Sequence, residues 1–289
     1  MGTKYPHVFA PIRIRGVDFK NRIELAPPSL NLCSADHLVT EEFVDLNRSI
    51  AWGGASIITV GNVMVDISEC ENEERQLDLS SDDCIMTLSK FALMCEGMGA
   101  HASLEINHGG KDSQFARTGK PAYAPSSYYS SWELMSAKQM GREPVKTIEM
   151  TVEHIHQTVE KYAQATLRAK KAGMRMAMIH CGHANLISQF SSPLYNHRTD
   201  EYGGSLENRA RFTIEILDRV RELCGEDFVI EARVSADEIK PGGMGYEETL
   251  KYIALIQDKI DILHVSAGVH GEFEYMKYWW QNYMMDREF

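Results

Sequence analysis

Two histidines, His180 and His183, stand directly after a short apolar run, Arg175–Ile179, that has the composition of a buried parallel strand. Side chains at the carboxyl end of a barrel strand point toward the place where substrates bind. An imidazole N–H can hydrogen-bond an oxygen that gains negative charge, so the pair predicts stabilisation of an oxyanion. An H-x-x-H pair alone also fits a structural role, in which each ring hydrogen-bonds a neighbouring loop.

A metal site is the second chemistry open to this pair, since neutral imidazoles are common zinc ligands. Its further ligands would be other histidines of the chain: His101, His108 and His197. No Asp or Glu stands near the pair at a metal-ligand spacing, so we favour the oxygen-binding role and assign no metal ligand. The six cysteines form no C-x-x-C pair, which argues against an iron–sulfur or zinc-ribbon motif.

Six short apolar segments alternate with amphipathic helical patterns along the chain. The predicted strands are Ile23–Ala26, Ser56–Val60, Ala102–Ile106, Arg175–Ile179, Val229–Arg233 and Ile262–Val265. One predicted helix begins after Thr151 and ends before Gly173, and a second begins after Ser205 and ends before Gly225. The repeated order of strand and helix predicts an α/β fold of the TIM (β/α)8 type, with about six β/α units present.

Two stretches do not fit this alternation. Lys111–Val145 has no convincing periodicity and is predicted to be a long loop after the third strand, either over the catalytic rim or as a plain surface insertion. Because the chain ends at Phe289, 24 residues follow Val265, too few for the two strands that an eightfold barrel still needs. We expect residues 1–289 to form one barrel domain truncated before strands seven and eight, which Gly271–Phe289 does not supply.

Composition and charge exclude several classes of function. The formal net charge of −11 argues against nucleic-acid binding, which needs a basic face. No apolar run approaches the roughly 20 residues that span a bilayer, and residues 1–11 lack the pattern of a signal peptide. We therefore expect a cytoplasmic protein without a membrane partner, and the sequence is compatible with a homo-oligomer.

Two blocks after the histidines carry a family resemblance. They read QFSSPLYN over 189–196 and RTDEYGGSLENR over 198–209. This stretch resembles the signature of the old yellow enzyme (NADH:flavin oxidoreductase) superfamily, in the branch near 2,4-dienoyl-CoA reductase and bacterial enoate reductases. Within it, Gly203 and Gly204 permit a tight turn and Ser205 caps the following helix, so the block is predicted to fix the loop that carries the histidines.

The resemblance implies a flavin-binding barrel and extends along the whole chain in order. It implies that FMN contacts the ends of four strands, at Pro27, Pro28, Ser29, Gly61, Glu105 and Arg233. Gly61 would let the ring approach, and Arg233 would stabilise the reduced anionic flavin. Each position also has a plainer explanation, because Pro and Gly shape strand ends and Arg233 could neutralise Glu231 or Asp237.

The chain departs from the family pattern at two positions. Glu105 stands where the family has a glutamine, and an ionised carboxylate can accept but not donate a hydrogen bond. Asn185 stands where the family commonly has a proton-donating tyrosine; it is expected to contact substrate, but an amide is no general acid. Substitute donors could come from the long third loop, as Tyr123, Tyr128 or Tyr129, or from solvent.

The implied activity is an FMN-dependent ene-reductase that takes hydride from NADH or NADPH and passes it to an activated C=C bond. His180, His183 and Asn185 would bind the carbonyl group of a small unsaturated substrate. Family barrels hold the FMN phosphate with loops after strands seven and eight, so FMN would bind poorly if Phe289 is the natural end. A 4Fe–4S cluster and FAD would belong to missing C-terminal parts. Three alternatives stay open: a flavin barrel with other redox chemistry such as amine oxidation, a metal-dependent hydrolase, and a non-catalytic remnant.

Overall fold

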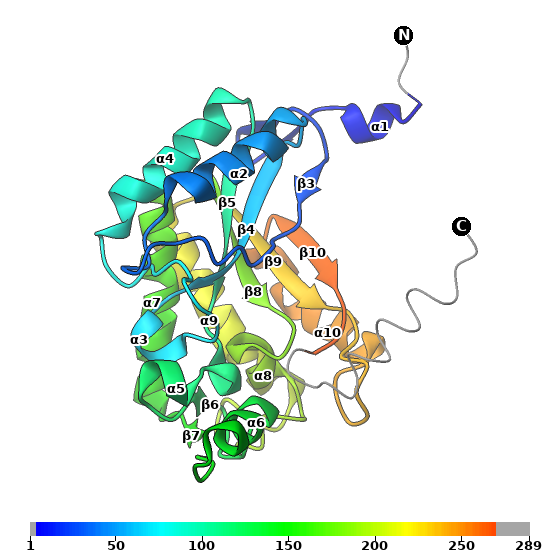
Figure 1. Cartoon of the computed structure of the whole chain (residues 1–289). Helices are drawn as coiled ribbons and strands as arrows, with labels where there is room; N and C mark the ends of the chain where they lie inside the picture. The colour runs from blue at the N-terminus through cyan, green and yellow to red at the C-terminus, as the bar shows by residue number, and fades with distance from the viewer. Residues whose placement is uncertain (1–3, 270–289) are drawn as a thin grey trace, which may run out of the picture.

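A curled sheet of six parallel strands forms the centre of the computed structural model, which describes residues 4–269 (Figure 1). The strands lie side by side in chain order, as β3 (Glu24–Leu25), β4 (Ile57–Met64), β5 (His101–Asn107), β8 (Met176–Cys181), β9 (Val229–Ser235) and β10 (Ile262–Ser266). Every one of them coincides with a predicted strand, and the predicted α/β class is confirmed. The curvature makes the sheet half of a TIM-type barrel.

Three strands run at least two residues further at their carboxyl ends than their apolar segments predict. β4 continues past Val60 to Met64, because a register shift between Val60 and Val63 accommodates Gly61 and Asn62. The backbone of Asn62 is left-handed, with a φ of 49°. β8 ends at Cys181 and β9 at Ser235, so His180 lies inside its strand rather than after it.

Helices cover the outer face of the sheet (Figure 1). They are α2 (Glu41–Trp52), α4 (Cys84–Gly97), α7 (Val152–Lys171), α9 (Leu206–Cys224) and α10 (Tyr246–Ile256). The predicted caps are confirmed: the side chains of Thr151 and Ser205 accept hydrogen bonds from the third residue of their helices. Gly173 and Gly225 follow the helix ends with positive φ angles. No described helix is both long and apolar enough to cross a membrane.

The amino ends of the strands are closed by an apolar plug. A hairpin of β1 (Ile12–Ile14) and β2 (Val17–Phe19) follows the short helix α1 (Pro6–Phe9). Val17 and Phe19 of this hairpin are buried against Ile57, Met176 and Val229. The plug thus fills the amino end of the barrel with packed apolar side chains.

Above the plug, the barrel interior carries a charged layer that we call the lower polar cluster: Glu24, Glu231 and His264. Nδ1 of His264 lies 3.5 Å from Glu231 and 3.8 Å from Glu24. The hydroxyl of Thr59 donates to Glu24 at 2.5 Å. Burial raises the pKa of Glu231, and the two carboxylates raise the pKa of His264. Charges in an interior must be compensated, and here they compensate one another.

The loop after β5 is more ordered than its sequence predicts. It contains η1 (Gly110–Asp112), α5 (Phe115–Thr118), β6 (Tyr123–Ala124) and α6 (Ser131–Met140), and β6 pairs with β7 (Ile148–Glu149). The side chain of Ser130 caps α6 by accepting from the Glu133 N–H. These elements gather with α8 (Leu186–Ser191) and α3 (Ile67–Cys70) at the carboxyl end of the sheet (Figure 1), and η2 (Gln257–Lys259) follows α10.

Candidate active site at the carboxyl ends of the strands

A chain of polar contacts joins residues of three strands and one loop at the carboxyl end of the barrel. Nδ1 of His180 lies 3.1 Å from the carboxylate of Glu105, and its Nε2 lies 3.3 Å from Nδ1 of His183. Nε2 of His183 in turn lies 2.7 Å from the hydroxyl of Ser266. The structure thus brings both predicted histidines together, edge to edge, between a buried carboxylate and a hydroxyl that the sequence analysis missed.

The loop that carries His183 has a strained backbone. His183 and Ala184 both have left-handed conformations, with φ angles of 57° and 58°, which cost energy in residues other than glycine. The hydroxyl of Ser235 accepts from the His183 N–H at 2.9 Å, and the side chain of Gln189 donates to the Ala184 carbonyl at 2.5 Å. The surrounding structure therefore imposes this conformation, as is typical of functional loops.

The signature block supports this loop from behind. The guanidinium of Arg198 donates to the carbonyls of Met150 and Pro125, which anchors the block to the loop after β5. A Cβ atom at Gly203 would clash with the backbone of Arg198, so the turn requires glycine here. The residues of the block bind structural partners, in keeping with its predicted role.

Asn185 takes part in a chain of side-chain amides. Its Oδ1 accepts from Nδ2 of Asn107 at 3.0 Å, and the same nitrogen lies 2.7 Å from Oδ1 of Asn62. Nδ2 of Asn62 then donates to Asn72 at 3.1 Å. Since Asn185 Oδ1 is occupied by Asn107, its Nδ2 is the polar group that it can offer to a substrate. The sequence analysis missed this chain of amides, because its members lie on different strands and their contacts cannot be read from one sequence.

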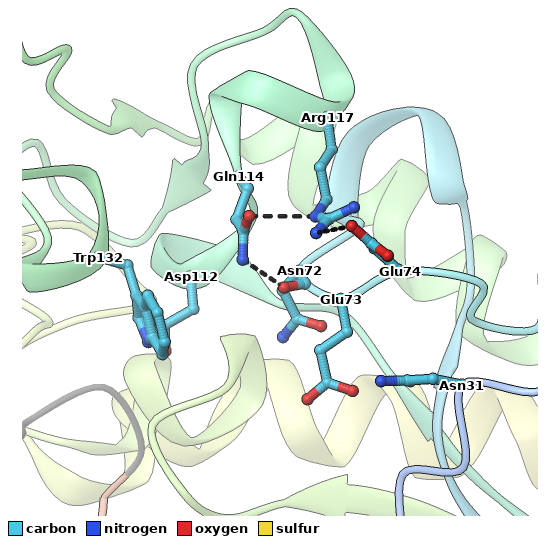
Figure 2. Close-up of a pocket in the computed structure, with 8 residues that line it drawn as sticks. All are labelled: Asn31, Asn72, Glu73, Glu74, Asp112, Gln114, Arg117 and Trp132. Atoms are coloured by element: carbon cyan, nitrogen blue, oxygen red, sulfur yellow. Dashed lines mark hydrogen bonds and ion pairs between the residues drawn. The ribbon is translucent and has the colours of Figure 1, made fainter. Parts of the chain in front are cut away.

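The amide chain ends at a polar cavity of about 340 Å³ (Figure 2). In this cavity Gln114 donates to the Asn72 carbonyl, and Arg117 bonds both Gln114 and Glu74. Figure 2 shows the carboxylate of Glu73 facing Asn31, and Glu73 also accepts from the hydroxyl of Ser29. The cavity therefore adjoins one of the predicted flavin-contacting residues.

The predicted cofactor residues lie around one position at the strand ends. Gly61 donates its N–H to the Pro28 carbonyl, and Ser29 forms a bridge with Gly61. A Cβ atom at Gly61 would lie 2.9 Å from Glu105 and from the Pro27 carbonyl, so only glycine fits. Opposite them, Arg233 donates to Glu105 at 2.8 Å.

These residues fit the polar edge of a flavin ring. The Nε–H of Arg233 is buried and donates no hydrogen bond to any described residue, so it remains as a donor for a ligand oxygen. The Gly61 backbone leaves no side chain in the way of a flat ring. Glu105 is held as an acceptor by its pairing with Arg233, which departs from the donating and accepting amide of the family.

The histidines of the alternative metal site are spread over the molecule. His101 begins β5 and contacts the Asp18 carbonyl beside the plug, at the end opposite His180. His108 is buried, and burial lowers its pKa to about 3, so it is a neutral imidazole that accepts from the Gly110 N–H. His197 is exposed. Within residues 4–269 these three do not form a metal site with His180 and His183.

The three tyrosines of the third loop differ in their distance from the histidines. Tyr128 packs against the group formed by Ala184 and Tyr195, beside the strained loop. Tyr123 instead contacts the ring of His154, and Tyr129 is exposed. Tyr128 is thus the tyrosine that the fold brings to the His183 loop.

The chain belongs to the NADH:flavin oxidoreductase / NADH oxidase family, which it matches over residues 7–285. It is 34% identical to the NADH oxidase of Thermoanaerobacter brockii over 270 residues, which are 93% of this chain and 40% of that protein. The structure of a 2-naphthoyl-CoA reductase superimposes with a TM-score of 0.84 at 24% identity, covering 98% of this chain and 46% of that one. An old yellow enzyme homologue from Zymomonas mobilis gives 0.76 at 23% identity, covering 90% and 73%.

The predicted membership of the NADH:flavin oxidoreductase superfamily is therefore confirmed. The likeness to the old yellow enzyme homologue confirms the predicted fold. The chain spans about 40% of the length of the Thermoanaerobacter relative. The curled sheet, in which each strand lies beside the previous one along the chain, has the same fold as the barrel of the old yellow enzyme homologue.

We expect Gly61→Ala to weaken FMN binding by at least about tenfold, because the new methyl group would displace Glu105 or the Pro27 backbone. The measurement is quenching of flavin fluorescence during titration of FMN with protein. Gly97→Ala is the matched control, since a Cβ atom there meets nothing within 4 Å. Equal affinity in the two variants would show that Gly61 does not border the flavin.

Proposed function

We propose that this chain is the flavin-binding barrel of an FMN-dependent ene-reductase that acts on small unsaturated carbonyl compounds. The observation that carries the proposal is the contact chain from Glu105 through His180 and His183 to Ser266, set at the carboxyl end of the barrel. Substrate chemistry in barrels of this type is found at that end.

The two histidines would bind the substrate's carbonyl oxygen. If the Ser266 hydroxyl donates to Nε2 of His183, then Nδ1 of that ring carries the proton and is the donor that faces His180. His180 with Nδ1–H toward Glu105 can also donate from Nε2 when the ring is doubly protonated, and the carboxylate balances that charge. A carbonyl oxygen that replaces the His180–His183 contact would accept from both rings, which stabilises a developing enolate.

FMN would be held at the edge of its ring by Gly61, Glu105 and Arg233, with the backbone of Pro27, Pro28 and Ser29 beside it. When bound, the flavin supplies the redox chemistry, accepting hydride from NADH or NADPH and delivering it to the β-carbon of the alkene. The guanidinium of Arg233 would place positive charge at the ring edge, and the strained loop would fix the histidines relative to it.

The remaining proton would come from Tyr128. Asn185 can donate a hydrogen bond but is not acidic enough to transfer a proton. Tyr128 packs against the cluster that contains Ala184, the residue after His183, and is the one of the three candidate tyrosines that lies near the loop carrying the histidines.

His180→Ala and His183→Ala should each lower kcat/KM for 2-cyclohexenone by roughly 10²-fold, since each removes one donor to the oxyanion. The flavin spectrum of the FMN-loaded protein should not change. The assay is NADH-driven reduction of the enone, and His197→Ala serves as the control because His197 is exposed.

Wild-type turnover in both histidine variants would contradict the assigned role. A yellow wild-type protein without activity on enones would support flavin binding, contradict ene-reduction and favour other redox chemistry such as amine oxidation. A protein that stays colourless with excess FMN would remove the proposal altogether.

Tyr128→Phe should slow alkene reduction by roughly 10²-fold while leaving flavin reduction by NADH unchanged, because only alkene reduction needs a proton donor. Stopped-flow absorbance of the flavin separates the two half-reactions. Tyr129→Phe is the control, since Tyr129 is 46% exposed and lies under Lys146. Unchanged alkene reduction in Tyr128→Phe would assign the proton to another group or to solvent.

A further inference from the structure

We propose that the lower polar cluster, Glu24, Glu231 and His264, is a binding site for a divalent transition metal such as Zn²⁺. This site lies in the barrel interior between the apolar plug and the Glu105–Arg233 pair, apart from the histidines of the proposed active site. Its three side chains come from β3, β9 and β10, which explains why no sequence spacing reveals it.

The ligand set has the right chemistry. Carboxylate oxygens and imidazole nitrogens are both zinc ligands in proteins, and three such ligands would leave a fourth position for water. Candidate ligand atoms of the three residues all lie within 4.8 Å of one another. Within residues 4–269, no other group of three or more His, Cys, Asp or Glu side chains has ligand atoms this close together.

The distances also suit coordination. Tetrahedral zinc with ligands at about 2.0–2.2 Å separates neighbouring ligand atoms by about 3.3–3.6 Å. Nδ1 of His264 lies 3.5 Å from Glu231 and 3.8 Å from Glu24. The 3.8 Å separation of His264 from Glu24 is too long for a hydrogen bond. Small side-chain movements would place all three ligand atoms at coordination distance from one ion.

The carboxylate of Glu231 gives an independent reason to expect a ligand. Glu231 is fully buried; Nδ1 of His264 lies 3.5 Å from one of its oxygens, and neither oxygen accepts a hydrogen bond of normal geometry from the described residues. Buried carboxylates are nearly always hydrogen-bonded or bound to metal. By contrast, Glu24 already accepts from the Thr59 hydroxyl, which is the kind of outer contact that orients a metal ligand.

A metal ion here would join the two edges of the described sheet. β3 and β10 are its outermost strands and form no ladder with each other, yet Glu24 and His264 meet inside the barrel. An ion bound by both, and by Glu231 of β9, would hold the curvature of the sheet beneath the flavin site. Binding should therefore stabilise the fold.

The test is native mass spectrometry of protein stripped with EDTA and supplied with Zn²⁺, together with the thermal midpoint. We expect one Zn²⁺ per chain and a higher Tm with the ion. Glu231→Gln and His264→Gln should each weaken Zn²⁺ binding at least 100-fold and abolish the Tm shift. If either fails to fold, Glu24→Gln, at the more exposed rim of the cluster, provides the same readout.

Two controls locate the ion. Glu222→Gln changes an exposed carboxylate on α9 and should bind Zn²⁺ like the wild type. His183→Ala should also retain the ion. Loss of Zn²⁺ in His183→Ala, with retention in His264→Gln, would place the metal at the active-site histidines and overturn the proposal. Absence of bound Zn²⁺ in the wild type would show that the cluster is balanced by protons alone.

Discussion

The buried carboxylate of Glu105 is the interaction on which the site depends. One of its oxygens contacts the guanidinium of Arg233 and the imidazole of His180, so three strands are joined through one carboxylate inside the barrel. A charge in such an environment is tolerated only when it is well paired. These contacts orient Arg233 and His180 at the carboxyl end of the barrel, where His180 also faces His183. A glutamine here could accept from both groups through its amide oxygen but would carry no charge to pair with the guanidinium.

The barrel interior is layered, and each layer has a separate task. The hairpin plug fills the amino ends with apolar side chains, and the lower polar cluster places one imidazole between two carboxylates above it. The Glu105 layer lies above them and borders the loops. There the backbone strain at His183 and Ala184 is balanced by Ser235 and Gln189. Rigidity is thus supplied by the sheet, whereas the residues proposed to meet substrate lie where strands pass into loops.

Much of the fold could be predicted from the sequence because it follows from local patterns. Apolar runs located all six strands, and capping residues such as Thr151 and Ser205 located the helix starts. The extension of β4 could not be predicted, since Gly61 and Asn62 normally end a strand and only the β5 ladder shows that pairing resumes. The amide chain of Asn62, Asn107 and Asn185 was missed for a related reason. Contacts between residues on different strands depend on register, which one sequence does not reveal.

The central claim is that Glu105 and Arg233 stabilise each other as a buried pair at the flavin edge. A double-mutant cycle measures this directly, with Glu105→Gln, Arg233→Gln and the double variant compared by urea unfolding. The account predicts that each single change is strongly destabilising, while the double change costs less than their sum, with a coupling energy of roughly 1–3 kcal/mol. A coupling energy near zero would mean that the two groups do not sustain each other, and would contradict the account of the site.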